Sequence, residues 1–190
     1  MAVGNGELPK FPPIKGIRLG VAEAGIKTAG RKDLVLIELA PGGTCAGVFT
    51  KNAFCAAPVT LCQRHMSSEL FAHDNAKYLL INTGNANAGT GQQGMTDAIA
   101  SCQFVASHFD SNVRQVLPFS TGVIGEKLPI DIIEKGIPQA ADKLNADNWL
   151  DAAQGILTTD TRPKGASVQL EYAGHRITIN GISAEVSYRF

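Results

Sequence analysis

The chain has 190 residues, and its 17 basic and 17 acidic side chains give a formal net charge of zero. With 44% hydrophobic and 18% charged residues, it cannot be a disordered chain, which needs low hydrophobicity and high net charge. The balanced charge lacks the basic surface that nucleic acids and anionic membranes require, so neither is an expected partner. The length predicts a single domain over residues 1–190.

The first half of the chain predicts short strands followed by one helix. Residues 1–16 hold three prolines and predict an extended arm. Strands are predicted at 17–22, 33–40, 45–50 and 78–82, with the second and third forming a hairpin around residues 41–43, and residues 58–63 form a further short apolar run. A helix is predicted at 97–108, with Thr96 as its N-cap and Ala98, Cys102 and Val105 on one buried face.

The second half adds one strand, two helices and a hairpin. A strand is predicted at 114–119, a short helix between Pro129 and a C-capping Gly136, and another helix at 148–157. Residues 167–172 and 176–180 alternate around the turn Ala173-Gly174, which predicts a hairpin with its apolar side chains facing inward. Strands and helices are mixed without strict βαβ order, so the predicted class is α/β, mixed α+β.

The ends, cysteines and histidines predict a soluble protein without a metal. No apolar stretch at the N-terminus resembles a signal peptide, and no run of about 18 apolar residues could span a membrane. The four cysteines form no C-x-x-C pair, so we expect reduced thiols in the cytoplasm and no zinc site; a nucleophilic cysteine is the alternative. The four histidines, His65, His73, His108 and His175, are expected at the surface or in packing.

Residues Gly89–Gly94 match the pattern G-x-G-x-x-G between a predicted strand and a predicted helix. A dinucleotide site is one interpretation, because such loops bring the backbone close to a pyrophosphate. The motif begins about seven residues past the strand, and no acidic residue ends the next strand as the fingerprint requires. The preferred interpretation is a loop in which glycine allows two backbone segments to approach closely.

Two polar segments are candidates for chemistry. In Ser120-Thr121-Gly122, a hydroxyl and a backbone N–H at the end of a strand could form an oxyanion hole, although many turns share this composition. Residues 158–164, TTDTRPK, follow a predicted helix and form either a polar substrate contact or a capped loop.

Several motifs occur together in one order: INTGNANAGTGQQG, PFSTGVIGEKLP and ILTTDTRPKGAS, preceded by GIRLGVAEAGIK, DLVLIELAPGGTCAGVF and NAFCAAPV. In this order and spacing they closely resemble the ornithine acetyltransferase family, the bifunctional glutamate N-acetyltransferases of arginine biosynthesis. The resemblance extends to about Ser183. It implies a layered αββα-type sandwich, shared with self-cleaving aminopeptidases.

The resemblance also implies a mechanism. Family precursors cut themselves before a Thr into an α chain and a β chain, which form α2β2 assemblies. The new N-terminal Thr accepts acetyl from N-acetylornithine, or in many members from acetyl-CoA, and passes it to glutamate. Thr121 and Gly122 match the family's oxyanion-hole pair, and Thr158 matches a substrate-binding position. No bound cofactor is expected.

The end of the sequence departs from the family pattern. The substrate-contacting Lys expected at position 184 is Ala184, and the cleavage Thr and the β chain do not follow. The expected molecule is therefore an α-chain-like part that is truncated and inactive alone. The alternatives are a non-catalytic remnant or partner-binding fragment, and part of a related self-cleaving aminopeptidase.

Overall fold

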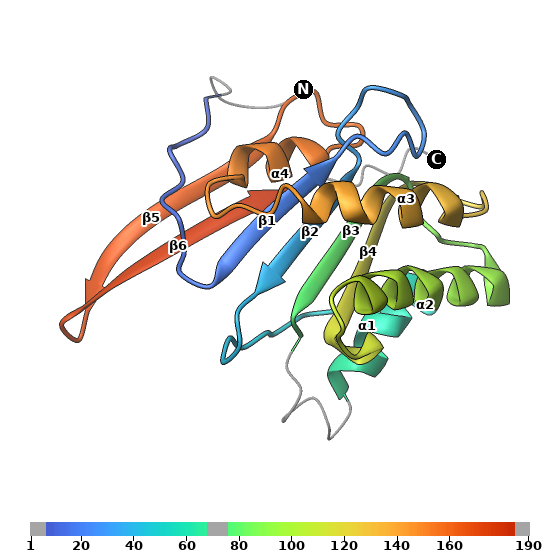
Figure 1. The fold of residues 1–190 in the computed structure, drawn as a ribbon, viewed down its shortest axis with the longest axis horizontal. Helices are drawn as coiled ribbons and strands as arrows, with labels where there is room; N and C mark the ends of the chain where they lie inside the picture. The colour runs from blue at the N-terminus through green and yellow to red at the C-terminus, as the bar shows by residue number, and fades with distance from the viewer. Residues whose placement is uncertain (1–6, 68–75, 185–190) are drawn as a thin grey trace.

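A computed structural model describes residues 7–67 and 76–184 of the chain. His73, the start of the arm and the residues after Ala184 lie outside the described part. Four strands, β1 (Ile17–Ala22), β2 (Leu34–Leu39), β3 (Tyr78–Asn85) and β4 (Val116–Val123), form a sheet in the order β1-β2-β3-β4 (Figure 1). β2 is antiparallel to both β1 and β3, whereas β3 and β4 are parallel.

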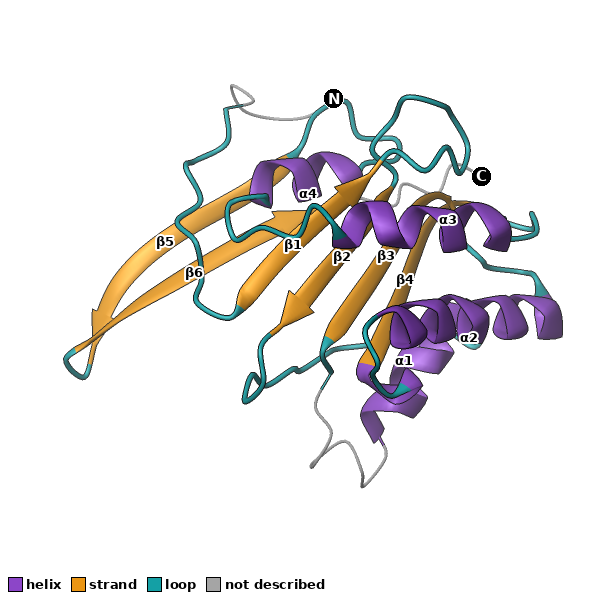
Figure 2. Ribbon diagram, viewed as in Figure 1, coloured by secondary structure: helices purple, strands orange, loops and turns teal. Residues whose placement is uncertain are grey.

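Helices connect the strands of this sheet (Figure 2). Helix α1 (Ala57–Ser67) lies between β2 and β3, and α2 (Gly91–His108) with the short 3-10 helix η2 (Val113–Gln115) makes the crossover from β3 to β4. Helices α3 (Ile130–Ala141) and α4 (Trp149–Gly155) follow, and a separate hairpin, β5 (Lys164–Tyr172) and β6 (His175–Ser183), ends the described chain. The predicted mixed α/β class is confirmed. None of the described helices is long and apolar enough to cross a membrane.

One face of the sheet is covered by helices. Alternate side chains of all four strands point to α1, α2 and α3 and form the largest core cluster, with Ala22, Leu34, Leu36, Tyr78, Leu80 and Val116 as its sheet members. Gly20 permits the contact with α3, because a Cβ there would lie 1.9 Å from the carbonyl oxygen of Ala140. Tyr78 stacks on Phe109 with ring centroids 4.4 Å apart, where α2 ends.

The opposite face is covered only at its two edges. At the β1 edge, Phe11 from the arm and Trp149 from α4 pack with strand residues, and at the β4 edge Cys45 and Phe49 pack near Leu117. Four apolar side chains of this face are incompletely covered, and we call them the open patch: Ile37, Leu79, Ile81 and Phe119. The first three also pack against the edge clusters. Phe119 retains 39% exposure.

The hairpin has the predicted alternation, but the inward orientation of its apolar side chains is wrong. Val168 pairs with Ile179 and Leu170 with Ile177, so all four lie on one face. These side chains are between 36% and 52% exposed, and Tyr172 on the same face is 71% exposed. The turn itself agrees with the sequence, since Ala173 and Gly174 both have the positive φ of a tight turn, 50° and 77°. The apolar face of this hairpin is therefore only partly covered in the described chain.

The predicted strand at 45–50 and its hairpin with β2 are wrong. Both edges of β2 are already paired, with β1 on one side and β3 on the other. The apolar run 58–63 lies within α1 instead, where Leu61, Cys62 and His65 are buried at helical spacing. Alternation alone could not show that this segment follows a helical period.

Two predicted helix ends are also wrong. Thr96 is not an N-cap, because α2 begins at Gly91 and the Thr96 hydroxyl bonds back to the Gln92 carbonyl at 3.2 Å. Gly136 is not a C-cap but an interior residue of α3. A Cβ at Gly136 would lie 2.8 Å from Leu34 Cδ2, so glycine here allows the helix to pack closely on the sheet.

Candidate active site

A pocket of about 280 Å³ lies at the carboxyl ends of the parallel strands β3 and β4. Three segments distant in sequence build its wall: the two strand ends, the loop of residues 23–33 between β1 and β2, which we call the pocket loop, and the chain just after α4. The lining residues are Lys27, Thr28, Arg31, Asp33, Thr83, Gly84, Thr121, Gly122, Val123, Thr158 and Thr159. Thr121, Gly122 and Thr158, the three residues singled out from the sequence, are therefore brought together around one cavity.

Thr121 places a buried hydroxyl at this pocket without a protein partner. Its Oγ1 is one of four buried side-chain atoms in the described chain that make no hydrogen bond. Leaving a buried polar group unpaired costs about 1–3 kcal/mol, so such a group in a pocket wall suggests that a ligand supplies the partner. A hydroxyl can donate to an anionic oxygen without displacing an existing internal bond.

Gly122 brings the two strands closer than any other residue could. Its φ is +138°, and a Cβ would lie 2.3 Å from the carbonyl carbon of Gly84 and 2.5 Å from the amide nitrogen of Asn85. Gly84 opposite has a φ of +97°, and the pairing of the strands shifts register at this point. Both glycines are therefore required by the backbone where the strands meet the pocket.

The pocket loop is held by side-chain bonds to backbone groups. Asp33 is buried and accepts hydrogen bonds from the backbone N–H groups of Ala24 (2.8 Å) and Ile26 (2.6 Å). Arg31 donates through Nη2 to the carbonyl oxygens of Leu157 (2.6 Å) and Thr158 (3.3 Å). Arg31 thus ties the pocket loop to the segment that carries Thr158.

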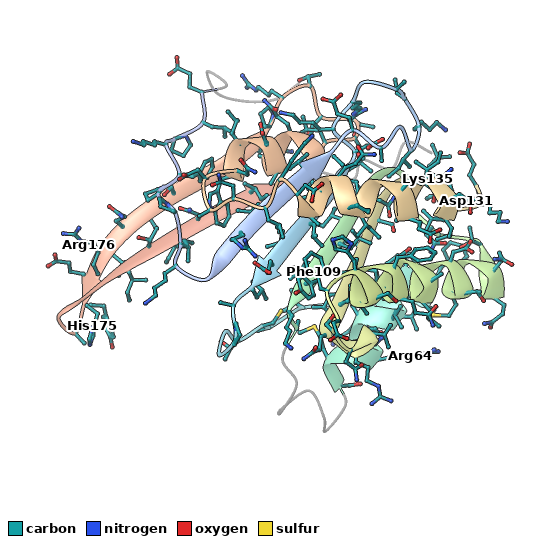
Figure 3. The ribbon with its side chains drawn as sticks, in the orientation of Figure 1. Arg64, Phe109, Asp131, Lys135, His175 and Arg176 are labelled. Carbon is teal, nitrogen blue, oxygen red and sulfur yellow. The ribbon has the colours of Figure 1, made fainter. Side chains whose placement is uncertain are left out.

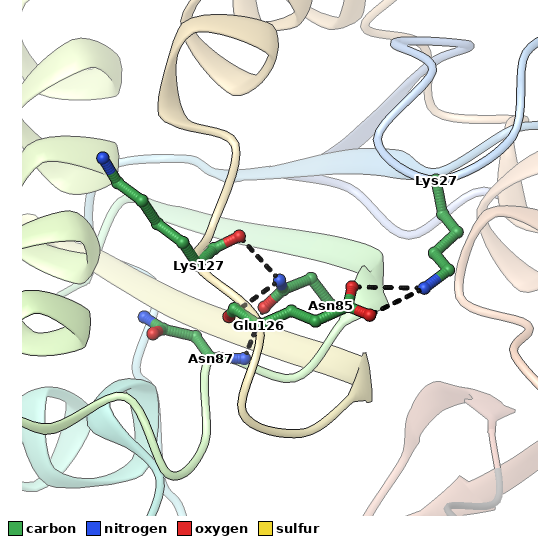
Figure 4. A network of polar contacts seen from close by, with 5 residues as sticks. All are labelled: Lys27, Asn85, Asn87, Glu126 and Lys127. Carbon is green, nitrogen blue, oxygen red and sulfur yellow. Dashed lines mark hydrogen bonds and ion pairs between the residues drawn. The ribbon is translucent and has the colours of Figure 1, made fainter.

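Figure 4 shows an ion pair between Lys27, which lines the pocket, and Glu126. Lys27 Nζ lies 3.2 Å from a carboxylate oxygen of Glu126, and both side chains are about half exposed. A Cβ on Gly84 would lie 2.7 Å from the Cβ of Lys27, so the pocket loop rests directly on the end of β3. Sequence reasoning missed Lys27, Arg31 and Asp33, because charged residues in a glycine-containing loop are usually no more than solvated.

The glycine pattern 89–94 contributes to packing. Gly91 is the first residue of α2, and Gly94 lies in its first turn. A Cβ at Gly94 would lie 1.9 Å from Thr90 Oγ1 and 2.5 Å from Asn87 Oδ1. These neighbours are side-chain atoms, and a Cβ at Gly91 would meet nothing within 4 Å, so the expected close approach of two backbone segments is not found at these two glycines.

The cysteines and the three described histidines are not among the residues that line the pocket. All four thiols are free, and burial raises the pKa of Cys62 to about 12 and that of Cys102 even higher, which disfavours a nucleophilic thiolate. His65 is buried, with Nδ1 2.8 Å from the Val116 carbonyl oxygen. His175 lies at the tip of the β5–β6 hairpin (Figure 3), so the expected packing and surface roles hold for these two. Within residues 7–67 and 76–184, no cluster of three or more His, Cys, Asp or Glu side chains could hold a metal ion.

The fold and the pocket together define a class of protein: a mixed α/β protein with a hydroxyl-rich pocket at the ends of two parallel strands. Comparison with known proteins identifies the family. The ArgJ family model matches residues 18–184, so the chain belongs to the ArgJ family.

Relatives and solved structures agree with this assignment. The arginine biosynthesis bifunctional protein ArgJ of Pseudomonas syringae pv. tomato is 51% identical over 96% of this chain, and that of Methylococcus capsulatus is 52% identical over 90%. These matches span only 44% and 40% of the relatives' own lengths.

Two crystal structures match the fold. The ArgJ protein of Bacillus halodurans superimposes with a TM-score of 0.80 at 33% identity and covers 90% of this chain. The ornithine acetyltransferase of Mycobacterium tuberculosis complexed with ornithine gives 0.79 at 31% identity and covers 91%. Of the matched chains in these crystals, 87% and 89% are covered.

Proposed function

We propose that this chain is the N-terminal, α-chain-like half of an acetyltransferase that moves an acetyl group from N-acetylornithine to glutamate. The observation that carries the proposal is the unpartnered, buried Thr121 hydroxyl in the pocket of an ArgJ-family chain. The ornithine bound to the M. tuberculosis relative supports an amino-acid substrate of this size.

In the proposed reaction, a Thr hydroxyl supplied by the C-terminal half attacks the acetyl carbonyl of N-acetylornithine. The Thr121 hydroxyl and the Gly122 N–H donate hydrogen bonds to the oxyanion that forms. The C–N bond then breaks, the ornithine amine leaves with a proton, and the acetyl group remains on the Thr oxygen. The amine of glutamate attacks this ester in turn, giving N-acetylglutamate and the free Thr. Thr158 contacts the substrate.

A two-chain enzyme is supported by the coverage of the relatives. The chain spans less than half of the curated relatives but nearly nine-tenths of each matched crystal chain. If the protein is cut into two parts, the curated full-length sequences are expected to be about twice as long as each chain in the crystal structures. We therefore propose self-cleavage and an α2β2 assembly for the complete enzyme.

The open patch supports the same partner. Ile81 and Phe119 are paired in register, and Thr83 and Thr121 follow two residues later on the same side of β3 and β4. A partner that covered the open patch would therefore extend to the pocket and could bring a nucleophile to Thr121. The proposed occupant is the C-terminal half.

Two finer points belong to the proposal. Acetyl-CoA is a second acetyl donor, used as a substrate and not as a bound cofactor. The enzyme works in the cytoplasm, which the four free thiols support, because thiols persist in reducing compartments.

The test is to replace Thr121 by Val in a two-part enzyme made from this chain and the C-terminal half of the P. syringae relative. The expected loss in kcat for transfer from N-acetylornithine to glutamate is about 10²–10³-fold, because one oxyanion donor is removed. The free energy of unfolding of the isolated chain should stay equal or rise, since Val is nearly isosteric and the lost hydroxyl had no partner. No transfer by the unchanged two-part enzyme, or full activity of T121V, would contradict the proposal.

A further inference from the structure

Two asparagines of β3, Asn82 and Asn85, flank the pair Thr121-Gly122 on the neighbouring strand. Both side chains are buried, each with 4% exposure. The Ser120 hydroxyl donates to Asn82 Oδ1 at 2.6 Å, and Asn82 Nδ2 donates to the Asn85 carbonyl oxygen at 2.9 Å. The residue just before Thr121 is thereby fixed to β3.

Asn85 fixes the chain on the other side of the pair. Its Nδ2 donates to the carbonyl oxygens of both Glu126 and Lys127 at 3.1 Å, as Figure 4 shows. Its Oδ1 accepts the backbone N–H of Asn87 at 2.8 Å. Both N–H groups of this amide are used, and every partner is a backbone group.

These bonds matter because, among the strands of the described chain, β4 pairs only with β3 and lies at an edge of the sheet. After Gly122 the chain turns away toward α3. Two backbone hydrogen bonds attach the chain up to Gly125: Ala86 N to Val123 O (2.9 Å) and Gly125 N to Ala88 O (2.8 Å). The side chain of Asn85 then holds the next two residues, Glu126 and Lys127. Thr121 and Gly122 are held between two anchors while the Thr121 hydroxyl keeps no partner.

We propose that Asn85 is a positioning residue for the oxyanion-binding pair: it touches no substrate and acts by holding the chain that follows Thr121-Gly122. This inference rests on the proposed function of that pair. Asn suits this position because its amide has two N–H donors for the two carbonyl oxygens and one acceptor for the N–H of Asn87. An Asp would turn acceptor oxygens toward two carbonyl oxygens and lose both bonds.

Asn87 offers a matched control in the same network. Its side chain is completely buried, donates to the Gly94 carbonyl oxygen at 2.8 Å and accepts from Thr90 Oγ1 at 2.8 Å, so it faces α2 and not the pocket. Asn87→Asp therefore removes a buried amide donor, as Asn85→Asp does, without releasing residues 126–127.

The experiment measures transfer by the two-part enzyme with N85D, N87D, T121V and the double variant N85D/T121V. N85D is expected to lower kcat about 10–100-fold with KM within about twofold, because the donors are misplaced while binding groups remain. N87D should keep kcat. If Asn85 acts through Thr121, the double variant should be no slower than T121V alone; losses that multiply, or an N85D enzyme with normal kcat, would overturn the inference.

A second measurement does not depend on the activity. In the isolated 190-residue chain, the amide NMR signals of Thr121 and Gly122 should move in N85D and stay in place in N87D. Unmoved signals would overturn the inference even if the unchanged enzyme were active. If the unchanged two-part enzyme shows no transfer, the proposed function fails, and these signals still decide whether Asn85 holds the segment. If N85D does not fold, N85S replaces it, because it removes the two hydrogen bonds that the Asn85 amide donates to Glu126 and Lys127 and adds no charge.

Discussion

At the residue scale, Thr121 and Gly122 are neighbours under opposite constraints. Thr121 contributes a hydroxyl that nothing else in the described chain uses, so stability does not require it. Gly122 contributes its lack of a side chain, because the backbone of β3 occupies the space where a Cβ would be. The fold makes no use of the Thr121 hydroxyl but requires glycine at the next position, although both residues line the same pocket.

Gly122→Ala is therefore expected to destabilise the isolated chain. The variant combines a positive φ with a contact of 2.3 Å to the carbonyl carbon of Gly84, so the strands must separate. We expect a loss of about 2–4 kcal/mol in the free energy of unfolding, measured by urea denaturation.

Gly125→Ala is the matched control for this prediction. Gly125 also has a positive φ, +81°, but a Cβ there would meet nothing within 4 Å. Its cost should be about 1 kcal/mol, from backbone strain alone. Equal losses in the two variants would show that the close approach of the strands has no energetic weight.

At the scale of elements, the pocket depends on a loop that has no regular structure of its own. The pocket loop is shaped by Asp33, whose carboxylate accepts two backbone N–H groups, and is joined to the segment after α4 by Arg31. The shape of the cavity thus follows from bonds between side chains and backbone, not from the sheet alone.

Asp33→Ala should lower the free energy of unfolding by about 2–3 kcal/mol, because it leaves the N–H groups of Ala24 and Ile26 without their acceptor. Denaturation of the isolated chain measures this loss. Asp151→Ala is the comparison, since Asp151 pairs with Lys32 on a partly exposed surface and should cost less than about 1 kcal/mol. A comparable cost for both would argue against the structural role of Asp33.

The contact between α1 and β4 predicts a pH dependence. Burial lowers the pKa of His65; the hydrogen bond to Val116 partly opposes this, and the charge of Arg114 adds to it. The folded pKa thus lies below the unfolded value of about 6.5, so the unfolded chain takes up a proton first as the pH falls. This contribution to stability is present above about pH 6.5 and is lost as the pH decreases through the folded pKa.

His65→Asn tests this dependence. The Asn amide can donate to the Val116 carbonyl oxygen but does not titrate between pH 5 and 8. The free energy of unfolding, measured at intervals from pH 8 to 5, should fall less steeply below pH 6.5 in H65N than in the unchanged chain. Parallel curves would mean that His65 does not contribute to the slope.

The elements that the sequence predicted well are those in which local pattern and tertiary contacts agree. β1 has its predicted bounds. The strands around Leu36 and Leu80 were found because runs of apolar residues are typical of strands, although one face of both strands is only partly covered in the described chain. The segment 45–50 was mispredicted because its composition is typical of a strand, but the edge of β2 with which it would pair is occupied by β3. Of the pocket residues, the sequence motifs predicted Thr121, Gly122 and Thr158. Asp33 and Asn85 could not be predicted, because each bonds to backbone groups distant in sequence.

At the scale of the whole molecule, two groups of exposed apolar side chains lie on sheet faces, apart from exposed residues elsewhere such as Val48 and Phe54. The open patch lies in the middle of the sheet, and the face of the hairpin with Val168, Leu170, Ile177 and Ile179 is uncovered. Contiguous exposed apolar surface of this kind marks a site of association. The open patch and the hairpin face are both consistent with the expectation that an isolated α-like chain exposes surface that a second half covers.

The double variant V168T/I179T tests the hairpin face. The two residues are cross-strand partners, 51% and 52% exposed, and Thr keeps the shape of Val and a high strand propensity. Self-association of the isolated chain, measured by sedimentation velocity over a range of concentrations, should decrease while the melting temperature changes little. The pair Gln169 and Thr178 on the polar face supplies the control, with Q169T leaving association unchanged. Equal association in both variants would mean that the hairpin face is not involved.

The uncovered face of the sheet also affects how such a protein is made. If the C-terminal half follows on the same ribosome, the N-terminal half folds first, and synthesis of the remainder at about 5–20 residues per second leaves the open patch exposed to water for roughly tens of seconds. During that time, neighbouring nascent chains present the same apolar surface to each other. In a relative of full length, the speed of translation and the availability of chaperones should thus set the yield of active enzyme more strongly than the stability of either half.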